Sequence, residues 1–457
     1  MQNNTKIIFW SITVALGGFL FGFDTAVISG AEQAIEQVWE LSVLEHGLTV
    51  SIALIGTVVG AMFGGLPSDA IGRKKTLFWI AALYLISALG SALAPEWYSF
   101  MLFRFLGGLG VGASSVAAPM YISEITPAAQ RGKMVGLFQF NIVLGILIAY
   151  LSNYLLSNTD NASWRWMLGV EAVPAAAFFT LLFYVPQSPR WLVVKRGAVE
   201  EAKKVLMEIN PDKAEASLKE IIASGEYEMQ KESVDSLFSK AYSFPVMLAI
   251  AFAGFNQLSG INAIIYYAPR VFEMAGLGKS SALLSSVGIG IMNLIFNIIG
   301  LFLIDRIGRR KLMFVGTLGV ITTLFLVAWF FYGDSIPGQY VPYLLFVYIG
   351  AFSMSQGTVI WVFISEIFPN KVRAAGQALG SFTHWILAAL VSFSFPYITA
   401  TLGAGNTFLF FAIMMVLQLV FVLKIMPETK GTSLEEVGRK RTGSKPTLYP
   451  REQARQV

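Results

Sequence analysis

A series of long apolar segments constrains this chain more than any other feature. A helix needs about 20 mostly apolar residues to cross the hydrocarbon core of a bilayer. Twelve segments of suitable length follow one another along the 457 residues. Because hydrocarbon offers no hydrogen-bond partner to an open backbone, such segments are expected to be helical, and the sequence predicts an all-α membrane protein. The expected spans are residues 7–30, 47–67, 76–94, 98–121, 134–156, 167–185, 244–268, 281–304, 312–332, 341–364, 375–399 and 406–425.

The composition supports this assignment and excludes several classes of protein. Only 13% of the residues are charged, against about 25% in a soluble domain. Cysteine is absent, which excludes a disulfide framework and a thiol nucleophile. The only histidines are His46, expected to be solvated, and His384, which argues against a histidine-rich metal site. The net charge of +5 resides mostly in short loops between apolar segments, so we predict no nucleic-acid partner. We also predict no metal and no cofactor.

A polar stretch divides the apolar segments into two sets of six. It contains EEAKKVLMEI and KAEASLKEII, whose apolar spacing predicts short amphipathic helices. The expected domains are an N-terminal six-helix bundle (1–185), a cytoplasmic linker (186–243), a C-terminal six-helix bundle (244–426) and a cytoplasmic tail (427–457).

The loop charges predict the orientation in the membrane. The loops after spans 2, 4, 8 and 10 hold most of the loop bases, and the loops after the odd-numbered spans hold only Arg165, Arg270 and Lys279. Because cytoplasmic loops are enriched in Lys and Arg, the first set is expected to be cytoplasmic, together with both termini. The basic tail segment RKRTGSK agrees with this orientation in the plasma membrane. The bases of the first set are Arg73, Lys74, Lys75, Arg131, Lys133, Arg306, Arg309, Arg310, Lys311, Lys371 and Arg373.

Two motifs occur once in each set of six spans. GGLPSDAIGRKK (64–75) corresponds to GLFLIDRIGRRK (300–311), and SEITPAAQR (123–131) corresponds to SEIFPNKVR (365–373). Parallel repeats of this kind place a binding site between the halves, near the bilayer midplane. The acids and bases of these motifs are expected to form a gating network on the cytoplasmic side; the alternative is that the bases only fix the topology.

These strings resemble the sugar porter family of the major facilitator superfamily, over about residues 7–440. The resemblance also rests on GFDTAVISG, PQSPRWL (186–192), NQLSGINAIIYYAP (256–269) and PETKG (427–431). It implies the major facilitator fold, with twelve transmembrane helices in two bundles. Three positions depart from the usual family pattern: Ala70 replaces an Arg, Gln187 a Glu, and Asn256 a Gln.

One carboxylate, Asp24, lies inside the first apolar segment. An ionised Asp in hydrocarbon costs at least about 2.5 kcal/mol, so a buried base is its expected partner. Arg104 is the only base between Glu96 and Arg131, and the resemblance implies the same pair. Similar proton symporters keep an acid at this position, which favours proton coupling; the alternative is a permanent structural pair.

The resemblance implies a sugar site, and the spans supply the neutral amides and aromatic rings that such a site needs, because amides match sugar hydroxyls and indole rings match the C–H faces. The alternative for each amide is a helix–helix hydrogen bond. His384 stands where the family usually has an amide, and it is expected either to bind a hydroxyl or to pack. Ser259-Gly260 and Gln356-Gly357 interrupt spans 7 and 10 and are expected to bend as gates. The resemblance implies that Gln139, Gln257, Asn262, Asn293 and Trp361 bind the sugar. The predicted site also includes Asn256 and His384, with Phe21, Tyr266, Tyr267 and Trp385 as wall residues.

The function expected from the sequence is proton-coupled symport of a monosaccharide by alternating access, by a protein active as a monomer in the lipid bilayer. A facilitative uniporter and a transporter-like sugar sensor are the alternatives, and an enzyme is not expected. The resemblance places Glu171 in the cytoplasmic gating network. The complete predicted network is Asp69, Arg73, Glu124, Arg131, Glu171, Asp305, Arg309, Glu366 and Arg373.

Overall fold

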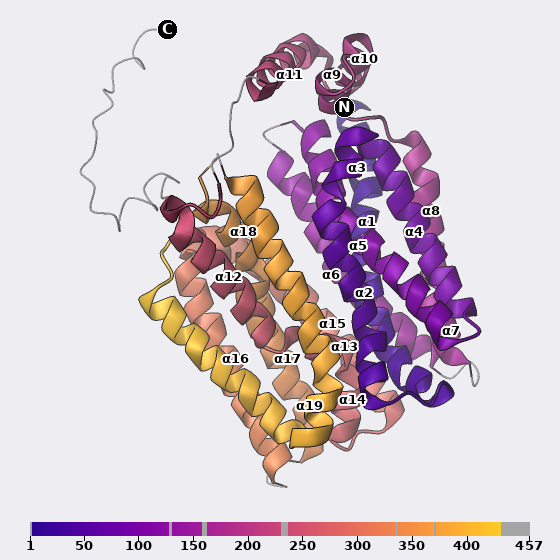
Figure 1. Cartoon of the computed structure of the whole chain (residues 1–457), viewed down its shortest axis with the longest axis vertical. Helices are drawn as coiled ribbons and strands as arrows, with labels where there is room; N and C mark the ends of the chain where they lie inside the picture. Colours follow the sequence, from indigo (N-terminus) through magenta and orange to yellow (C-terminus); the bar gives the residue numbers. More distant parts are fainter. Residues whose placement is uncertain are drawn as a thin grey trace.

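The computed structural model describes residues 2–127, 130–157, 162–229, 236–333, 337–369 and 372–430. In these residues all regular secondary structure is helical, and the helices form two bundles that lie side by side (Figure 1). The N-terminal half contains the helices from α1 to α8, and the C-terminal half contains those from α12 to α19. The predicted all-α fold is therefore confirmed.

The helices of the N-terminal half match the first six predicted spans. Helix α2 begins with a capping box, in which Ser42 and Glu45 satisfy each other's backbone N–H groups. The sixth span of this half is broken between α7 and α8. The bounds are α1 (Gln2–Val38), α2 (Val43–Phe63), α3 (Gly65–Ala70), α4 (Arg73–Leu93), α5 (Trp97–Ile125), α6 (Arg131–Leu156), α7 (Ser163–Gly169), α8 (Ala172–Leu181) and η1 (Leu182–Tyr184).

Three short helices lie in the connection between the halves: α9 (Pro189–Val194), α10 (Val199–Ile209) and α11 (Ala214–Met229), with η2 (Pro211–Lys213) between the last two. They bury a small apolar core of their own, which includes Trp191, Leu192 and Leu206. All three lie beyond the same end of the bundles (Figure 1). We call this the linker end of the molecule, and the other the opposite end.

The C-terminal half contains the remaining helices. Its last helix, α19, runs for 52 residues, which would make it about 78 Å long if it were straight. Instead Gly403 adopts a non-helical φ of 82°, and the chain turns back there (Figure 1). The bounds are η3 (Lys240–Tyr242), α12 (Ser243–Leu258), α13 (Ile261–Tyr266), α14 (Ala268–Met274), α15 (Lys279–Ile307), α16 (Arg309–Tyr332), η4 (Gly338–Tyr340), α17 (Val341–Phe352), η5 (Ser353–Gly357), α18 (Thr358–Ile367) and α19 (Arg373–Lys424).

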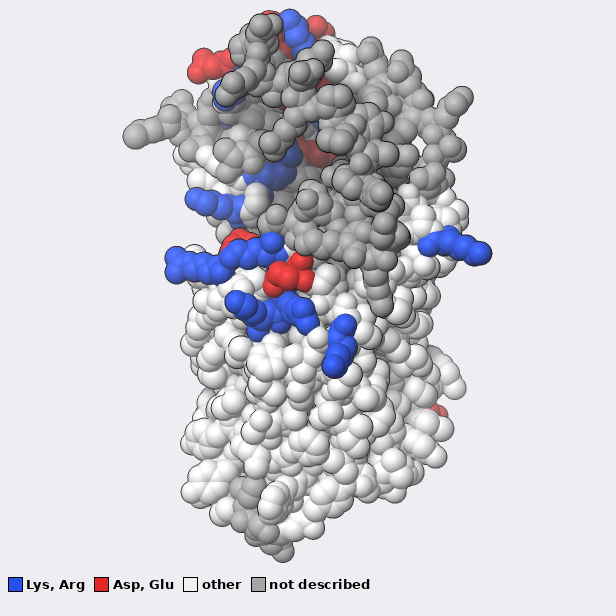
Figure 2. All heavy atoms as spheres, turned by 90° about the vertical axis from the view of Figure 1, so that its left-hand side faces the viewer, with Lys and Arg blue, Asp and Glu red and all other residues white. Residues whose placement is uncertain are grey.

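The described helices are long and apolar enough to cross a membrane in twelve places. Eleven helical segments of the described chain meet the length and hydropathy requirements, and α19 provides two spans because it bends at Gly403. On the face shown in Figure 2, charged side chains gather toward the linker end, and the surface beneath them is almost entirely uncharged. This distribution suits a surface that faces lipid over most of its height.

Helices α1 and α6 pack closely because glycines replace side chains at their contact. A Cβ atom on Gly22 would lie 1.8 Å from the carbonyl oxygen of Ile142, and one on Gly145 would lie 2.1 Å from that of Phe19. Small residues at helix contacts let the two backbones approach, as is common in membranes. This contact fixes the part of α1 that carries Asp24.

Candidate functional site

A cavity of about 140 Å³ lies between the two halves. This volume is below the roughly 300–1,000 Å³ of pockets for drug-sized ligands, and it suits a small solute. Helices α1 and α6 line it from the N-terminal half, and α12, α13, α17, α18 and α19 line it from the C-terminal half, with η5. The lining residues are Phe21, Thr25, Ile142, Ile146, Asn256, Gln257, Ile261, Asn262, Ile265, Tyr266, Phe352, Gly357, Ile360, Trp361, His384 and Trp385.

Amides of the C-terminal half form a continuous hydrogen-bonded chain along this cavity. Gln257 donates from Nε2 to Asn256 Oδ1 over 3.0 Å, and Asn262 donates from Nδ2 to Gln257 Oε1 over 2.8 Å. The Nε2 atom of Gln257 also lies 3.1 Å from Nδ1 of His384. Asn256 and Gln257 are almost fully buried. A solute with hydroxyl groups could exchange hydrogen bonds with this chain, because each amide both donates and accepts.

Two breaks interrupt helices that line this cavity. Gly260 takes the left-handed conformation, with φ 83°, and thereby separates α12 from α13. A Cβ atom there would also lie 2.5 Å from the ring of Phe411. In the tenth span, the π-helical turn η5 interrupts the helix at the predicted Gln356-Gly357 position, and such turns occur often at functional sites. Both predicted interruptions are confirmed.

Aromatic rings surround His384 at the cavity wall. Its ring centre lies 5.0 Å from that of Trp361 and 4.8 Å from that of Trp385. Phe21 of the N-terminal half packs on Trp385, with ring centres 5.5 Å apart. The cavity therefore combines apolar faces with polar edges, which is the combination a sugar ring requires.

Eight of the predicted sugar-binding residues line this cavity, and three predicted residues do not. Gln139 lies half-buried on α6, and Asn293 on α15 accepts a hydrogen bond from Ser353 over 2.8 Å. Tyr267, expected in the wall, is fully buried and donates its hydroxyl to the carbonyl oxygen of Ser392. Thr25 lines the cavity but was not predicted, although it follows Asp24 directly. The sequence alone does not show which face of each helix is turned toward the cavity.

Asp24 and Arg104 form a buried ion pair in the N-terminal half. Arg104 donates from one terminal nitrogen to the Asp24 carboxylate and from the other to the Asp24 carbonyl oxygen. The two residues are 3% and 1% exposed. The predicted partnership between them is present, next to the α1 segment that lines the cavity.

Glu171 lies elsewhere than predicted. It was expected in the network at the linker end, but it is buried at the break between α7 and α8, within electrostatic reach of Asp24 and Arg104. Its Oε1 and the Nε of Arg104 have no hydrogen-bond partner among the described residues. The N-terminal half thus encloses two carboxyl groups and one guanidinium group in its core.

At the linker end, the N-terminal half carries a clamp centred on Arg73. Its guanidinium donates two hydrogen bonds of 3.0 Å to Glu124 and one of 3.0 Å to Asp69. Gly72, with φ 94°, makes the turn that begins α4. Gln187 accepts the backbone N–H of Lys74 over 3.0 Å. We call this set the N-clamp.

The C-terminal half carries the same arrangement, which we call the C-clamp. Arg309 donates to both oxygens of Glu366, over 3.1 and 2.8 Å, and lies 3.1 Å from Asp305. Gly308 also has φ 94°. Glu428 takes the place of Gln187 and accepts the backbone N–H groups of Arg309 and Arg310, each over 3.0 Å.

Two further predicted members of the network lie outside these clamps. Arg131 is exposed at the start of α6, and Arg373 donates to the carbonyl oxygen of Phe368 over 3.4 Å. Lys371 and the RKRTGSK segment lie outside the described residues.

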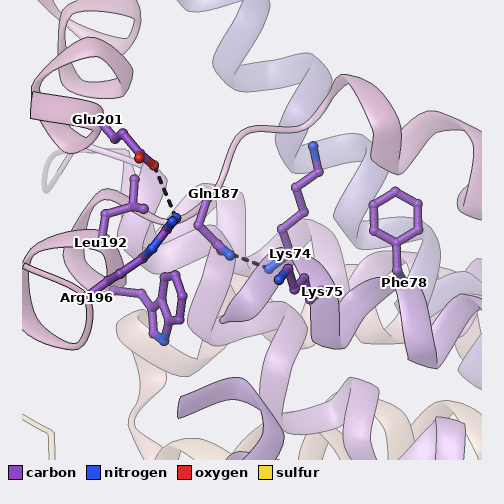
Figure 3. A pocket seen from close by; sticks show the side chains of 8 residues that line it. Lys74, Lys75, Phe78, Gln187, Leu192, Arg196 and Glu201 are labelled. Carbon is purple, nitrogen blue, oxygen red and sulfur yellow. Dashed lines mark hydrogen bonds and ion pairs between the residues drawn. The ribbon is translucent and has the colours of Figure 1, made fainter. Parts of the chain in front are cut away.

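A larger pocket, of about 510 Å³, lies at the linker end (Figure 3). Lys74, Lys75 and Arg196 line it, with Gln187 and Trp191. Its walls come from α4 and the first linker helices, and no described residue of the C-terminal half lines it. Rocking of the two halves would therefore not alternate its access, whereas the smaller, central cavity has walls from both halves.

His46 is buried, although the sequence predicted a solvated side chain. It has no exposed surface, because Glu32 of α1 and Tyr267 of the other half cover it.

The chain matches a known family over most of its length. A family model for sugar (and other) transporters matches residues 10–440. The chain is 37% identical over 438 residues to the arabinose-proton symporter of Bacillus subtilis (strain 168), with 94% of each protein covered. It is 35% identical over 478 residues to the D-xylose-proton symporter of Escherichia coli (strain K12), with 95% of this chain and 96% of that protein covered.

Solved structures show the same architecture. The inward open conformation of the xylose transporter XylE from E. coli matches with a TM-score of 0.83 and 33% identity, covering 94% of this chain and 98% of that one. XylE bound to 6-bromo-6-deoxy-D-glucose matches with a TM-score of 0.78 and 34% identity, covering 96% and 99%.

Proposed function

The chain belongs to the sugar (and other) transporter family, a family of multi-pass membrane transporters rather than enzymes, and on that premise we propose that it imports a monosaccharide, a pentose or a hexose, together with a proton. The buried Asp24–Arg104 pair beside the amide-lined cavity carries this proposal. The named relatives that couple arabinose or xylose to protons support it.

The sugar is held mainly by the C-terminal half. Gln257, Asn262 and His384 supply hydrogen bonds, and Trp361 and Trp385 supply apolar faces. Gln139 and Asn293, which do not line the cavity in this conformation, join when the halves close around the sugar. This assignment is supported by the direct bonds among the amides, which a sugar hydroxyl can replace one for one.

The proton acts in the N-terminal half. Ionised Asp24 holds Arg104 by charge as well as by hydrogen bonding. When Asp24 takes up a proton the charge attraction is lost, and Glu171 offers Arg104 an alternative carboxylate. Each inward proton gains about 2.3 kcal/mol per 100 mV of membrane potential, enough to drive accumulation.

The linker end is proposed to face the cytoplasm of the cell, in the plasma membrane, because the loops there carry most of the loop bases. The two clamps then lie on the cytoplasmic side. Each clamp joins helices of one half, whereas Tyr150 of α6 donates to the carbonyl oxygen of Ile265 in the other half, over 2.7 Å. The TM-score of 0.83 to an inward open structure supports an inward-facing conformation. Alternating access by a monomer then requires the contacts at the opposite end to part.

Uptake by purified protein in liposomes tests the proposal. Labelled pentoses, hexoses and inositol are offered with and without an inward proton gradient. Accumulation of one sugar above equilibrium, abolished by a protonophore, is the expected result. Equilibration without accumulation would make the protein a uniporter and Asp24–Arg104 a structural pair.

A further inference from the structure

Four ionisable side chains meet at the opposite end, between the two halves. Arg270 of α14 donates to Glu32 of α1 through two nitrogens, over 3.1 and 2.9 Å, and also to Glu36. His46 of α2 places Nε2 2.5 Å from Glu32 and Nδ1 4.0 Å from Glu36. We call these four residues the outer cluster.

The outer cluster divides its charges unequally between the halves. Both carboxylates and the histidine belong to the N-terminal half, and Arg270 belongs to the C-terminal half. Any motion that separates the halves at this end must therefore remove the guanidinium from both carboxylates. Breaking a buried ion pair from one side is costly, because the remaining charge is left unpaired. Glu32 and His46 are fully buried here.

We propose that His46 is a second proton site, which binds a proton from the external side and thereby releases Arg270, so that acid outside opens this end of the transporter. The proposal rests on the alternating access and orientation proposed above. It assigns to His46 a role distinct from that of Asp24: Asp24 serves coupling, and His46 controls access to the external side.

The charges around His46 give the direction of the effect. The groups that face it are Glu32 and Glu36 of α1 and Tyr267 and Arg270 of the other half; Glu273 of α14 lies near Arg270. In the closed arrangement the guanidinium of Arg270 already offsets part of the negative charge of the two carboxylates. Once the halves part, a protonated His46 can replace that positive charge. The proton therefore binds more tightly in the open arrangement, and by linkage it favours opening.

Arg270 itself cannot act as the titrating group. Burial alone would lower its pKa, but the carboxylates of Glu32 and Glu36 raise the pKa above its ordinary value. The guanidinium therefore stays charged at every physiological pH. A change in the outer cluster with pH has to come from the acids or from the histidine, and histidine is the side-chain type that ordinarily changes its charge between pH 5 and 8.

The absence of cysteine makes a direct test possible. Val287 is nearly buried and lies three residues before Gly290, on the face of α15 that meets Leu147 of α6. A cysteine there (Val287→Cys) reports opening at this end through its labelling by a membrane-impermeant maleimide from outside. Ser280→Cys, at an exposed position in the same helix, corrects for the effect of pH on thiol chemistry.

The labelling rate of Val287→Cys relative to Ser280→Cys is expected to rise as the external pH falls from 7.5 to 5.5. A tenfold preference of the proton for the open state would raise the open population up to about tenfold. His46→Gln should abolish the rise. Arg270→Gln should give high labelling at both pH values, and Arg270→Lys should restore part of the closed behaviour.

A pH response that persists in His46→Gln, or unchanged labelling in Arg270→Gln, would overturn the proposal. Labelling at Ser280→Cys and sugar binding, measured for each variant, show that the variant is folded. Sugar accumulation in the same liposomes separates the two proposals, because a failure of proton coupling would remove accumulation and leave the labelling response in place.

Discussion

The two halves of the molecule are alike at the linker end and different in their cores. Arg73 and Arg309 occupy equivalent positions, each bound to an acid four residues earlier and to a second acid on a neighbouring helix. In the core, the N-terminal half buries charges around Arg104, whereas the C-terminal half buries neutral amides around Gln257.

This difference separates two tasks that conflict in one site. Ionised groups inside a membrane are expensive and respond to protons, whereas a sugar needs neutral donors and acceptors that keep their hydrogen bonds at every pH. Keeping the charges in one half and the amides in the other lets a proton act on the motion of the halves without disrupting the sugar contacts. On the proposed mechanism, the repeated clamps serve the motion that both halves share.

Asp24→Asn should have the largest effect, because it removes the charge that gives the N-terminal core its proposed role. Accumulation driven by a pH gradient should be lost, while some sugar counterflow remains, since the amide-lined cavity is intact. The measurement is uptake and counterflow in the same liposomes. Glu220→Gln, which removes an exposed carboxylate in the linker, is the control and should accumulate sugar normally. Full accumulation by Asp24→Asn would refute the coupling role.

Gln257→Ala should have the next largest effect, on sugar affinity rather than on coupling. It removes the centre of the amide chain and leaves buried partners unsatisfied, which costs about 1–3 kcal/mol. The dissociation constant of the sugar should therefore rise about tenfold or more. Gln418→Ala removes a buried amide of the same half that lies outside the cavity, so its affinity should stay close to that of the wild type. Equal losses in both variants would show a general packing effect.

The sequence predicted the spans and the breaks well, because both depend on local residues. A run of about twenty apolar residues is long enough to span the membrane. The Ser259-Gly260 pair weakens the helix that contains it, wherever that helix lies in the fold. The repeated motifs predicted a network of acids and bases without naming its pairs, and the structure pairs Arg73 with Glu124 and Arg309 with Glu366, since equivalent positions in two repeats meet equivalent partners.

The errors concern residues whose surroundings come from distant parts of the chain. His46 lies near the start of a span, and it is buried because Glu32 of α1 and Tyr267 of the C-terminal half both cover it. Glu171 was assigned to the linker end, but the helix break beside it turns it toward Arg104. Gln139 and Asn293 are a separate case: they lie outside the cavity lining in this conformation, and the direction of each side chain depends on helix rotation, which a repeat pattern does not fix.

Sugar transport should depend equally on the two clamps, in each of which an arginine binds one carboxylate through two nitrogens. Lys cannot bind a carboxylate through two nitrogens as Arg does, so Arg73→Lys and Arg309→Lys should each slow sugar counterflow several-fold. Arg306→Lys, an exposed change in the same loop, is the control. A large effect from only one of the two clamps would show that the repeated geometry does not reflect a shared role in the motion.

The smallest expected effect comes from a position where the clamps differ in charge, Gln187 against Glu428. Burial would raise the pKa of Glu428, but the backbone N–H groups of Lys430, Arg309 and Arg310 outweigh it and lower the pKa below its ordinary 4.5. A carboxyl group whose pKa is lower in the folded than in the unfolded protein stabilises the fold at pH values above its unfolded pKa. This contribution is lost as the pH falls through its folded pKa.

Glu428→Gln should therefore unfold at a slightly lower temperature than the wild type at pH 7, and the difference should disappear as the pH falls through and below 4. The effect on stability should be below about 1 kcal/mol, because a charge at a partly exposed helix N-terminus is screened. Gln187→Glu should give the opposite change at pH 7, since a carboxylate there would meet the N–H of Lys74 at the start of α4. Thermal unfolding in detergent at both pH values measures the pair. A stability difference that did not depend on pH would mean that the charge of Glu428 does not matter, and that its shape and hydrogen bonds do the same as those of Gln187.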